Sequence, residues 1–184
     1  MEFIRQLPRF HEIGALNSCS DDAARFALRN LDLKDKVVCE FGCGTGVFTK
    51  EIEKQKPSLL LGFEVNPRFS AITDTRCPGA QIINDSAAKV GDYLESNGHD
   101  SCDYIISTLP WSLFDSRMQD DILDSAYASL RQGGRFITIG YVFSDLTENG
   151  RRLKRILRNR FRKVLKTKMV WKNLPPAFFY TCLK

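Results

Sequence analysis

The feature that most constrains this chain is a glycine-rich turn placed directly after a short apolar stretch. Residues 36–41 read KVVCEF, which is typical of a buried strand, and residues 42–46 read GCGTG. Glycine lets a backbone turn tightly and approach a ligand where any Cβ would collide. A helix is expected to follow, up to about residue 54, with its free N–H groups facing the same place. This order predicts an α/β fold that binds a ligand on the turn, and a tight turn without a ligand is the alternative.

Strand-like and helix-like segments alternate along the rest of the chain. Apolar runs predict further strands at residues 58–64, 80–84, 102–108, 134–141, 164–171 and 178–183. Helices are expected over residues 20–31, from 67 onward, over 87–96, over 119–130 and from about 151. The alternation predicts one domain over residues 1–184. Its sheet would be mainly parallel and seven-stranded, with helices on both faces and a closing antiparallel strand.

The spacing of the glycines narrows the kind of ligand. A dinucleotide fingerprint, G-x-G-x-x-G, would require glycine where Val47 stands, and the G-K-[ST] of a phosphate-binding P-loop is absent. Residues 40–46 read E-F-G-C-G-T-G, which resembles motif I of the class I S-adenosylmethionine (SAM)-dependent methyltransferases. The resemblance implies a Rossmann-like fold with SAM as cofactor. The residues it assigns to the amino-acid part of SAM are Glu40, Gly42, Cys43, Gly44 and Gly46.

Two further acidic residues end predicted strands. Glu64 lies 18 residues after Gly46, and a carboxylate at the carboxyl end of a strand can accept hydrogen bonds from both ribose hydroxyls. Asp85 ends the third strand, where the family resemblance implies contact with the adenine amino group, although Asp85 also suits the N-cap of the next helix. The predicted nucleoside-binding residues are Glu64, Val65, Asp85, Ser86 and Ala87.

The predicted fourth strand runs into the segment S-T-L-P-W, residues 107–111, which faces the transferring methyl group in this fold. Nucleobase N-methyltransferases place N-P-P-[FYW] or N-L-P-[FY] here, but Thr108 stands at the asparagine position and cannot present a carboxamide oxygen. The segment resembles the S-x-L-P of bacterial phospholipid N-methyltransferases more closely. The residues expected to wall the methyl-transfer point are Ser107, Leu109, Pro110 and Trp111. The general base is left open between Tyr141, His11 and solvent.

Both ends of the chain extend this resemblance. Residues 1–18 contain F-I-R, P-R and I-G-A pieces like those of the phospholipid N-methyltransferases, and residues 171–177 (WKNLPPA) resemble their closing hairpin. In the opening segment apolar residues recur at roughly helical spacing with arginines between them, as in a helix that lies in a membrane interface. Packing on the domain's own surface is the alternative for this segment.

Charge is distributed unevenly. Residues 151–172 contain 11 Lys and Arg and no acid, whereas the other 162 residues hold 16 basic and 22 acidic groups. Such a basic segment indicates an anionic partner, and an anionic membrane leaflet and RNA phosphates fit it equally well. A solvated basic face without a partner is the third interpretation.

Composition excludes several classes of protein. The six cysteines form no C-x-x-C pair and the two histidines have no neighbours at ligand spacing, so no metal site is expected and the cysteines are interpreted as small apolar core residues. No apolar stretch approaches 18 residues and the start lacks a secretory signal. We therefore expect a cytoplasmic protein that has access to the inner face of the membrane.

These observations predict a SAM-dependent N-methyltransferase that acts on a phospholipid or other lipid amine headgroup at the membrane surface. One alternative is an RNA adenine N-methyltransferase that uses Trp111 to stack on the base. The other is a SAM-binding module without catalysis that docks on membranes through its basic segment.

Overall fold

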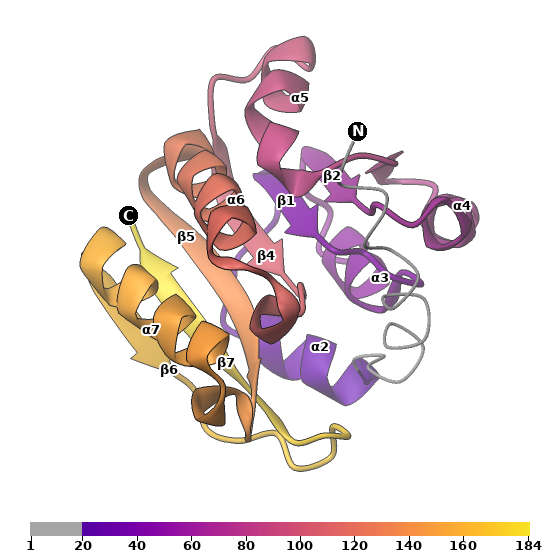
Figure 1. Ribbon diagram of the computed structural model, residues 1–184. Coiled ribbons are helices and arrows are strands. Elements are labelled where there is room, and N and C mark those ends of the chain that lie inside the picture. The colour runs from indigo at the N-terminus through magenta and orange to yellow at the C-terminus, as the bar shows by residue number, and fades with distance from the viewer. Residues whose placement is uncertain (1–19) are drawn as a thin grey trace.

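A single mixed sheet forms the centre of the molecule (Figure 1). The computed structural model describes residues 20–184. Within them seven strands lie in the order β3-β2-β1-β4-β5-β7-β6. Their bounds are β1 (Val37–Phe41), β2 (Leu59–Phe63), β3 (Gln81–Ile83), β4 (Cys102–Ser107), β5 (Leu130–Tyr141), β6 (Lys163–Lys166) and β7 (Ala177–Leu183). Strands β1 to β5 are parallel, and β7 is antiparallel to both β5 and β6. The predicted sheet, including its closing antiparallel hairpin, is confirmed.

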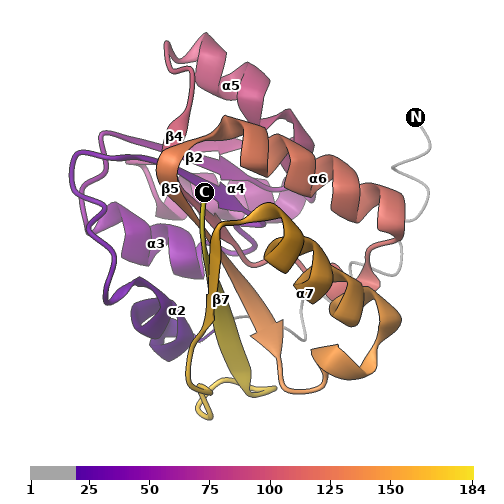
Figure 2. The same cartoon turned by 90° about the vertical axis from the view of Figure 1, so that its left-hand side faces the viewer.

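Helices cover both faces of the sheet, as Figure 2 shows from the side. Their bounds are α2 (Asp21–Leu28), α3 (Val47–Glu53), α4 (Pro67–Arg76), α5 (Val90–Ser96), α6 (Ser116–Ser129) and α7 (Glu148–Arg160), with short 3₁₀ turns η2 (Ala87–Lys89), η3 (Trp111–Leu113) and η4 (Ser144–Leu146). No helix within residues 20–184 is long and apolar enough to cross a membrane. The predicted membrane-contact segment, residues 1–18, lies outside the described residues.

Each face of the sheet has its own hydrophobic core. All five residues of β1 are buried, as expected for a central parallel strand covered on both sides. Because side chains alternate along a strand, Cys39 and Phe41 pack toward α5 and α6, whereas Val38 packs toward α2 and α3. The same alternation places Glu40 on the side of Val38, where it is the one charged residue of a strand that is otherwise apolar.

Local capping and packing shift several predicted boundaries. Helix α6 begins at Ser116, not at 119, because the Asp115 carboxylate accepts a hydrogen bond from the Met118 N–H at 2.8 Å and caps the helix. Strand β5 begins at Leu130, four residues earlier than predicted. Strand β6 ends at Lys166, so residues 167–176 form a loop with an isolated bridge between Val170 and Ala177.

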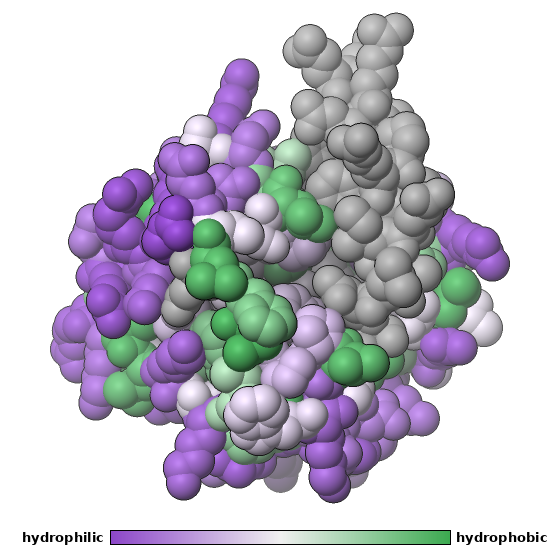
Figure 3. Space-filling view, turned by 60° about the horizontal axis from the view of Figure 1, so that its bottom comes forward, coloured by the Kyte–Doolittle hydropathy of each residue, from purple (hydrophilic) through white to green (hydrophobic). Residues whose placement is uncertain are grey.

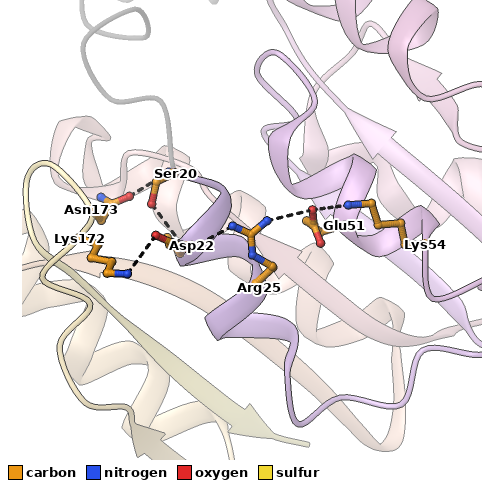
Figure 4. Close-up of polar contacts among 8 residues, drawn as sticks. Ser20, Asp22, Arg25, Glu51, Lys54, Lys172 and Asn173 are labelled. Atoms are coloured by element: carbon orange, nitrogen blue, oxygen red, sulfur yellow. Dashed lines mark hydrogen bonds and ion pairs between the residues drawn. The ribbon is translucent and has the colours of Figure 1, made fainter.

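The closing loop is bonded to the start of α2 through Ser20 (Figure 4). Ser20 is the N-cap of α2, as predicted, whereas its contact with the loop was not predicted. The Ser20 hydroxyl accepts the Ala23 N–H at 3.2 Å, and the Ser20 N–H donates to Asn173 Oδ1 at 3.0 Å. Asn173 is 2% exposed, and its Nδ2 donates to the Pro175 carbonyl at 2.8 Å. The buried amide therefore fixes the closing loop against the first turn of α2.

Candidate functional site

The glycine-rich turn has the backbone conformation that the sequence predicted. Gly42, Gly44 and Gly46 have φ angles of 83°, 54° and 90°, a region that strains other residues. A Cβ at Gly42 would lie 3.0 Å from Leu109 Cδ2, and one at Gly46 would lie 3.2 Å from Thr73 Cγ2. Among the described residues, no atom lies within 4 Å of a Cβ placed at Gly44. Gly44 therefore presents bare backbone to open space, whereas its two neighbouring glycines allow close packing.

Helix α4 holds the turn through two residues that the sequence analysis did not identify. The Thr73 hydroxyl donates to the Gly44 carbonyl at 2.8 Å, and Arg76 Nη1 donates to the Thr45 carbonyl at 2.9 Å. No motif marks either residue, because the contact depends on how α4 packs against the turn. The thiol of Cys43 points away from the open side, since a Cβ at Gly62 would lie 2.6 Å from its Sγ. Cys43 therefore offers a ligand only its backbone.

Glu40 lies beneath the turn with its carboxyl group fully buried. Burial raises the pKa of Glu40 from its ordinary value of 4.5 to about 7, and the nearby Glu64 carboxylate acts in the same direction, whereas the Thr49 hydroxyl favours the charged form. The Thr49 hydroxyl lies close enough to act on the carboxylate, but among the described residues no group makes a well-formed hydrogen bond with either carboxyl oxygen. A buried carboxyl without a well-formed hydrogen bond costs free energy of folding, and a cationic or hydrogen-bond-donating ligand would offset that cost.

The structure brings Glu64 to the turn, as predicted. Its Oε2 accepts the Gly44 N–H at 2.9 Å and its Oε1 accepts the Asn66 N–H at 2.9 Å. Burial raises the pKa of Glu64 despite these two backbone hydrogen bonds. The adjacent Val65 is 40% exposed. A carboxylate thus lies within one hydrogen bond of the bare main chain at Gly44, which suits recognition of a polyhydroxylated ligand.

Asp85, Ser86 and Ala87 follow β3 at the same edge of the sheet. Asp85 accepts hydrogen bonds from the Ser86 N–H at 2.7 Å, Lys89 Nζ at 2.8 Å and the Tyr93 hydroxyl at 3.1 Å, and the contact with Lys89 lowers the pKa of Asp85. The N-cap of the following turn is Ser86, so the alternative role of Asp85 as that cap is wrong. Ala87 is buried. The assignment of Asp85 to the adenine group stays a prediction.

The S-T-L-P segment lies directly against the glycine-rich turn. The Thr108 hydroxyl donates to the Gly42 carbonyl at 2.6 Å, and the Thr108 N–H donates to the Phe41 carbonyl at 2.9 Å. The Leu109 side chain fills the space that a Cβ at Gly42 would take. Ser107 is buried, and its Oγ lies 3.5 Å from the Leu109 N–H. The structure therefore joins the two motifs that the sequence placed at one site, and Thr108 connects them.

Trp111 is a core residue, so it presents no exposed ring for the base stacking that the RNA alternative requires. The side chain is 3% exposed, and its Nε1 donates to the Thr138 hydroxyl at 2.7 Å. The ring packs edge-on against Phe114 and Phe136. Because its indole N–H is bonded to Thr138 and its ring packs against two phenylalanines, Trp111 contributes mainly packing, and it lines a small hollow together with Leu109 and Pro110. Tyr141 lines a small hollow next to Pro110.

A carboxamide at position 64 provides a test of the nucleoside-binding prediction. We expect Glu64→Gln to weaken SAM binding by about tenfold or more, because loss of charge weakens hydrogen bonds from both ribose hydroxyls. Glu53→Gln is the matched control, since Glu53 also accepts a backbone N–H, from Gly79 at 2.5 Å, but lies outside the site. Titration calorimetry measures both affinities. Equal affinities for the two variants would contradict the assignment.

Comparison with known proteins agrees with this geometry. Residues 38–134, more than half of the chain, match the family described as "Methyltransferase domain". The ornithine lipid N-methyltransferase of Singulisphaera acidiphila is 26% identical over 178 residues, which cover 92% of this chain and 88% of that protein.

Solved structures share the fold. The O-methyltransferase of Bacillus cereus, solved in complex with SAH, covers 100% of this chain and 91% of its own, with a TM-score of 0.73 and 14% identity. The match to magnesium protoporphyrin IX methyltransferase of Synechocystis, solved with bound SAM, covers 89% of this chain and 77% of that protein, with a TM-score of 0.70 and 12% identity. The match to an rRNA methylase of Streptococcus thermophilus covers 89% of this chain and 94% of that protein, with a TM-score of 0.65 and 16% identity. With the family match and the glycine-rich site together, this chain belongs to the SAM-dependent methyltransferases.

Proposed function

We propose that this protein transfers a methyl group from SAM to the amine of a lipid headgroup at the membrane surface. The observation that carries the proposal is the match, over nearly the whole chain, to a protein named for N-methylation of ornithine lipid. The geometry of the S-T-L-P segment supports it. Thr108 has no carboxamide with which to accept a hydrogen bond from a nucleobase amine, and its hydroxyl already donates to the Gly42 carbonyl.

The residues of the site fit SAM. Bound SAM supplies a methyl group on an electrophilic sulfonium. The unpartnered Glu40 carboxylate suits the ammonium of its amino-acid part, the bare backbone at Gly44 permits close approach, and Glu64 suits the ribose hydroxyls. Leu109 and Pro110 form an apolar wall that keeps water from the transfer point, and exclusion of water favours an unprotonated amine.

The basic segment is consistent with an anionic surface, although part of it stabilises the fold. Arg152 Nη2 pairs with Asp120 at 2.6 Å, and Arg160 pairs with Asp124, so these two arginines join α7 to α6. The remaining cations of the segment include exposed side chains on α7 and around β6. Examples are Arg155, Arg158, Lys163 and Lys168.

RNA remains the second candidate acceptor because the fold is also that of an rRNA methylase. The likeness at 16% identity concerns the fold alone. Burial of Trp111 removes the aromatic surface on which a flipped base would stack, and stacking supplies much of the affinity for an unpaired base. The site therefore favours the lipid amine.

Transfer of a labelled methyl group tests the proposal. The protein is incubated with methyl-labelled SAM and with vesicles that contain ornithine lipid or phosphatidylethanolamine, or with total RNA. We expect label in lipid and not in RNA. Label in RNA alone would contradict the proposal, and label in neither acceptor, with SAM binding intact, would favour a module without catalysis.

A further inference from the structure

Four large apolar side chains are exposed on two neighbouring loops. Phe143 and Leu146, after β5, are 65% and 73% exposed. Trp171 and Leu174, in the loop before β7, are 73% and 84% exposed. Such side chains cost free energy in water, and their concentration on two loops indicates a surface that becomes covered.

The two loops form one surface. The Val142 N–H donates to the Pro176 carbonyl at 3.0 Å, which joins the loop after β5 to the loop before β7. Both leave the sheet where Tyr141 pairs with Ala177. In Figure 3, which brings this edge of the molecule forward, apolar side chains gather in the middle, with hydrophilic ones to their left and below. We call the exposed side chains of Phe143, Leu146, Trp171 and Leu174 the docking face.

The docking face lies at the edge of the sheet that carries the methyl-transfer site. Strand β5 is parallel to β4 and β1, so the loop after β5 leaves from the same edge as the glycine-rich turn and residues 107–111. The Asn149 side chain, on the first turn of α7, donates to the Ser112 carbonyl at 3.3 Å. This bond ties the segment after η4 to the segment after the S-T-L-P motif.

Cations flank the docking face. Lys168 and Lys172 lie in the loop before β7 and are exposed, and Lys172 Nζ lies 3.9 Å from the exposed Asp22 carboxylate. Arg151 is exposed on the first turns of α7 and donates to the Leu146 carbonyl at 3.0 Å, and Glu148 beside it is an exposed acid. The apolar tips would gain nothing from RNA phosphates, and two like-charged faces would repel in a dimer of this chain. Apolar tips with cations beside them suit an anionic lipid bilayer, which takes the apolar groups into its interface and pairs its headgroups with the cations.

We propose that the docking face inserts into an anionic bilayer and holds the methyl-transfer site at the level of the headgroups, so that the acceptor amine reaches the site without leaving the membrane. The proposal rests on the lipid acceptor proposed above and specifies where the membrane binds. Buried Asn173 lies between Trp171 and Leu174, and its bonds to Ser20 and Pro175 hold that loop in a fixed shape. The tips are therefore presented on a preformed surface, which lowers the entropy cost of insertion.

Partition onto vesicles tests the docking face. The full chain and a Trp171→Ser/Leu174→Ser variant are sedimented with vesicles of phosphatidylglycerol and phosphatidylethanolamine. We expect the variant to bind about tenfold more weakly. The matched control is Leu165→Ser, because Leu165 is 53% exposed on β6, outside the docking face, and should bind as the unchanged chain does. A Phe143→Ser/Leu146→Ser variant should repeat the loss from the other loop.

A second measurement separates docking from catalysis. With a short-chain, monomeric acceptor of the same headgroup, the docking-face variants should keep the turnover of the unchanged chain, and only turnover on vesicles should fall. Equal vesicle binding by variants and control would overturn the proposal, as would self-association that blocks the face in the absence of lipid. If the unchanged chain methylates no lipid but the variants still lose vesicle binding, the lipid acceptor is wrong and the docking face stands.

Discussion

Glu40→Gln will stabilise the ligand-free protein at pH 8 and, in the same molecule, weaken its binding of SAM. The stability effect follows from burial, which raises the pKa of Glu40 from 4.5 to about 7 in the folded chain. An acid whose folded pKa is raised binds its proton more tightly when folded, so its contribution to stability falls as pH rises from about 4.5 to about 7. Well above pH 7 the charged Glu40 lowers the free energy of unfolding by its full amount, on the order of 3 kcal/mol. Glutamine carries no charge and avoids this cost.

The binding effect has the opposite sign. Within residues 20–184 neither carboxyl oxygen of Glu40 makes a well-formed hydrogen bond, and the SAM ammonium would donate charged hydrogen bonds to them. A neutral carboxamide would lose roughly 2 kcal/mol of that interaction, or about 30-fold in affinity. Affinity of the unchanged protein should also rise between pH 5.5 and 7.5, as Glu40 loses its proton, whereas the variant should show no such rise.

Thermal unfolding between pH 5 and 8 and titration calorimetry with SAM measure the two effects. Glu53→Gln is the control, because Glu53 lies outside the site. The stability of this variant should depend on pH in the same way as that of the unchanged chain. A Glu40→Gln variant that binds SAM as tightly as the unchanged protein would remove Glu40 from the cofactor site. A variant less stable at pH 8 would show that the carboxyl has a partner in the folded protein.

The second large effect is a loss of SAM affinity in Gly44→Ala, and Gly98→Ala is its closely matched control. Both residues have positive φ, 54° and 78°, and at both an added Cβ would meet no atom of residues 20–184 within 4 Å. We therefore expect Gly44→Ala and Gly98→Ala each to cost about 1 kcal/mol of folding stability, through backbone strain alone. Only the Gly44 methyl group would stand where the cofactor approaches the main chain. SAM affinity should fall at least about tenfold in Gly44→Ala and stay unchanged in Gly98→Ala.

Chemical denaturation and calorimetry on the same preparations decide this comparison. Equal losses of stability with unequal SAM affinity would place the ligand on the bare backbone at Gly44. Equal SAM affinity in the two alanine variants would mean that this backbone does not contact the cofactor.

The sequence predicted the fold because the signals for it are local. Alternating apolar runs and helix caps such as Ser20 depend on neighbouring residues, and the alternation of strands with helices favours a mainly parallel sheet. Boundaries were less accurate where a cap or a register shift decides them. Asp115 extended α6, and β5 continues through Gly133, whose φ is 75°, next to a register shift against β4.

Only those residues of the site that belong to sequence motifs could be predicted. The glycine-rich turn, Glu64 and the S-T-L-P segment meet as expected, because strand ends of a parallel sheet converge at one edge. Thr73 and Arg76 were missed because their contacts with the turn depend on tertiary packing. The burial of Trp111 could not be predicted, because a tryptophan after a strand has the same sequence signature whether it faces a ligand or, as here, bonds to Thr138 in the core.

Titration calorimetry of the purified protein with SAM and with S-adenosylhomocysteine is the most direct test of the account. Saturable binding of both, at one site per chain, is the predicted result. Absence of binding by either nucleoside to the folded, unchanged protein would contradict it.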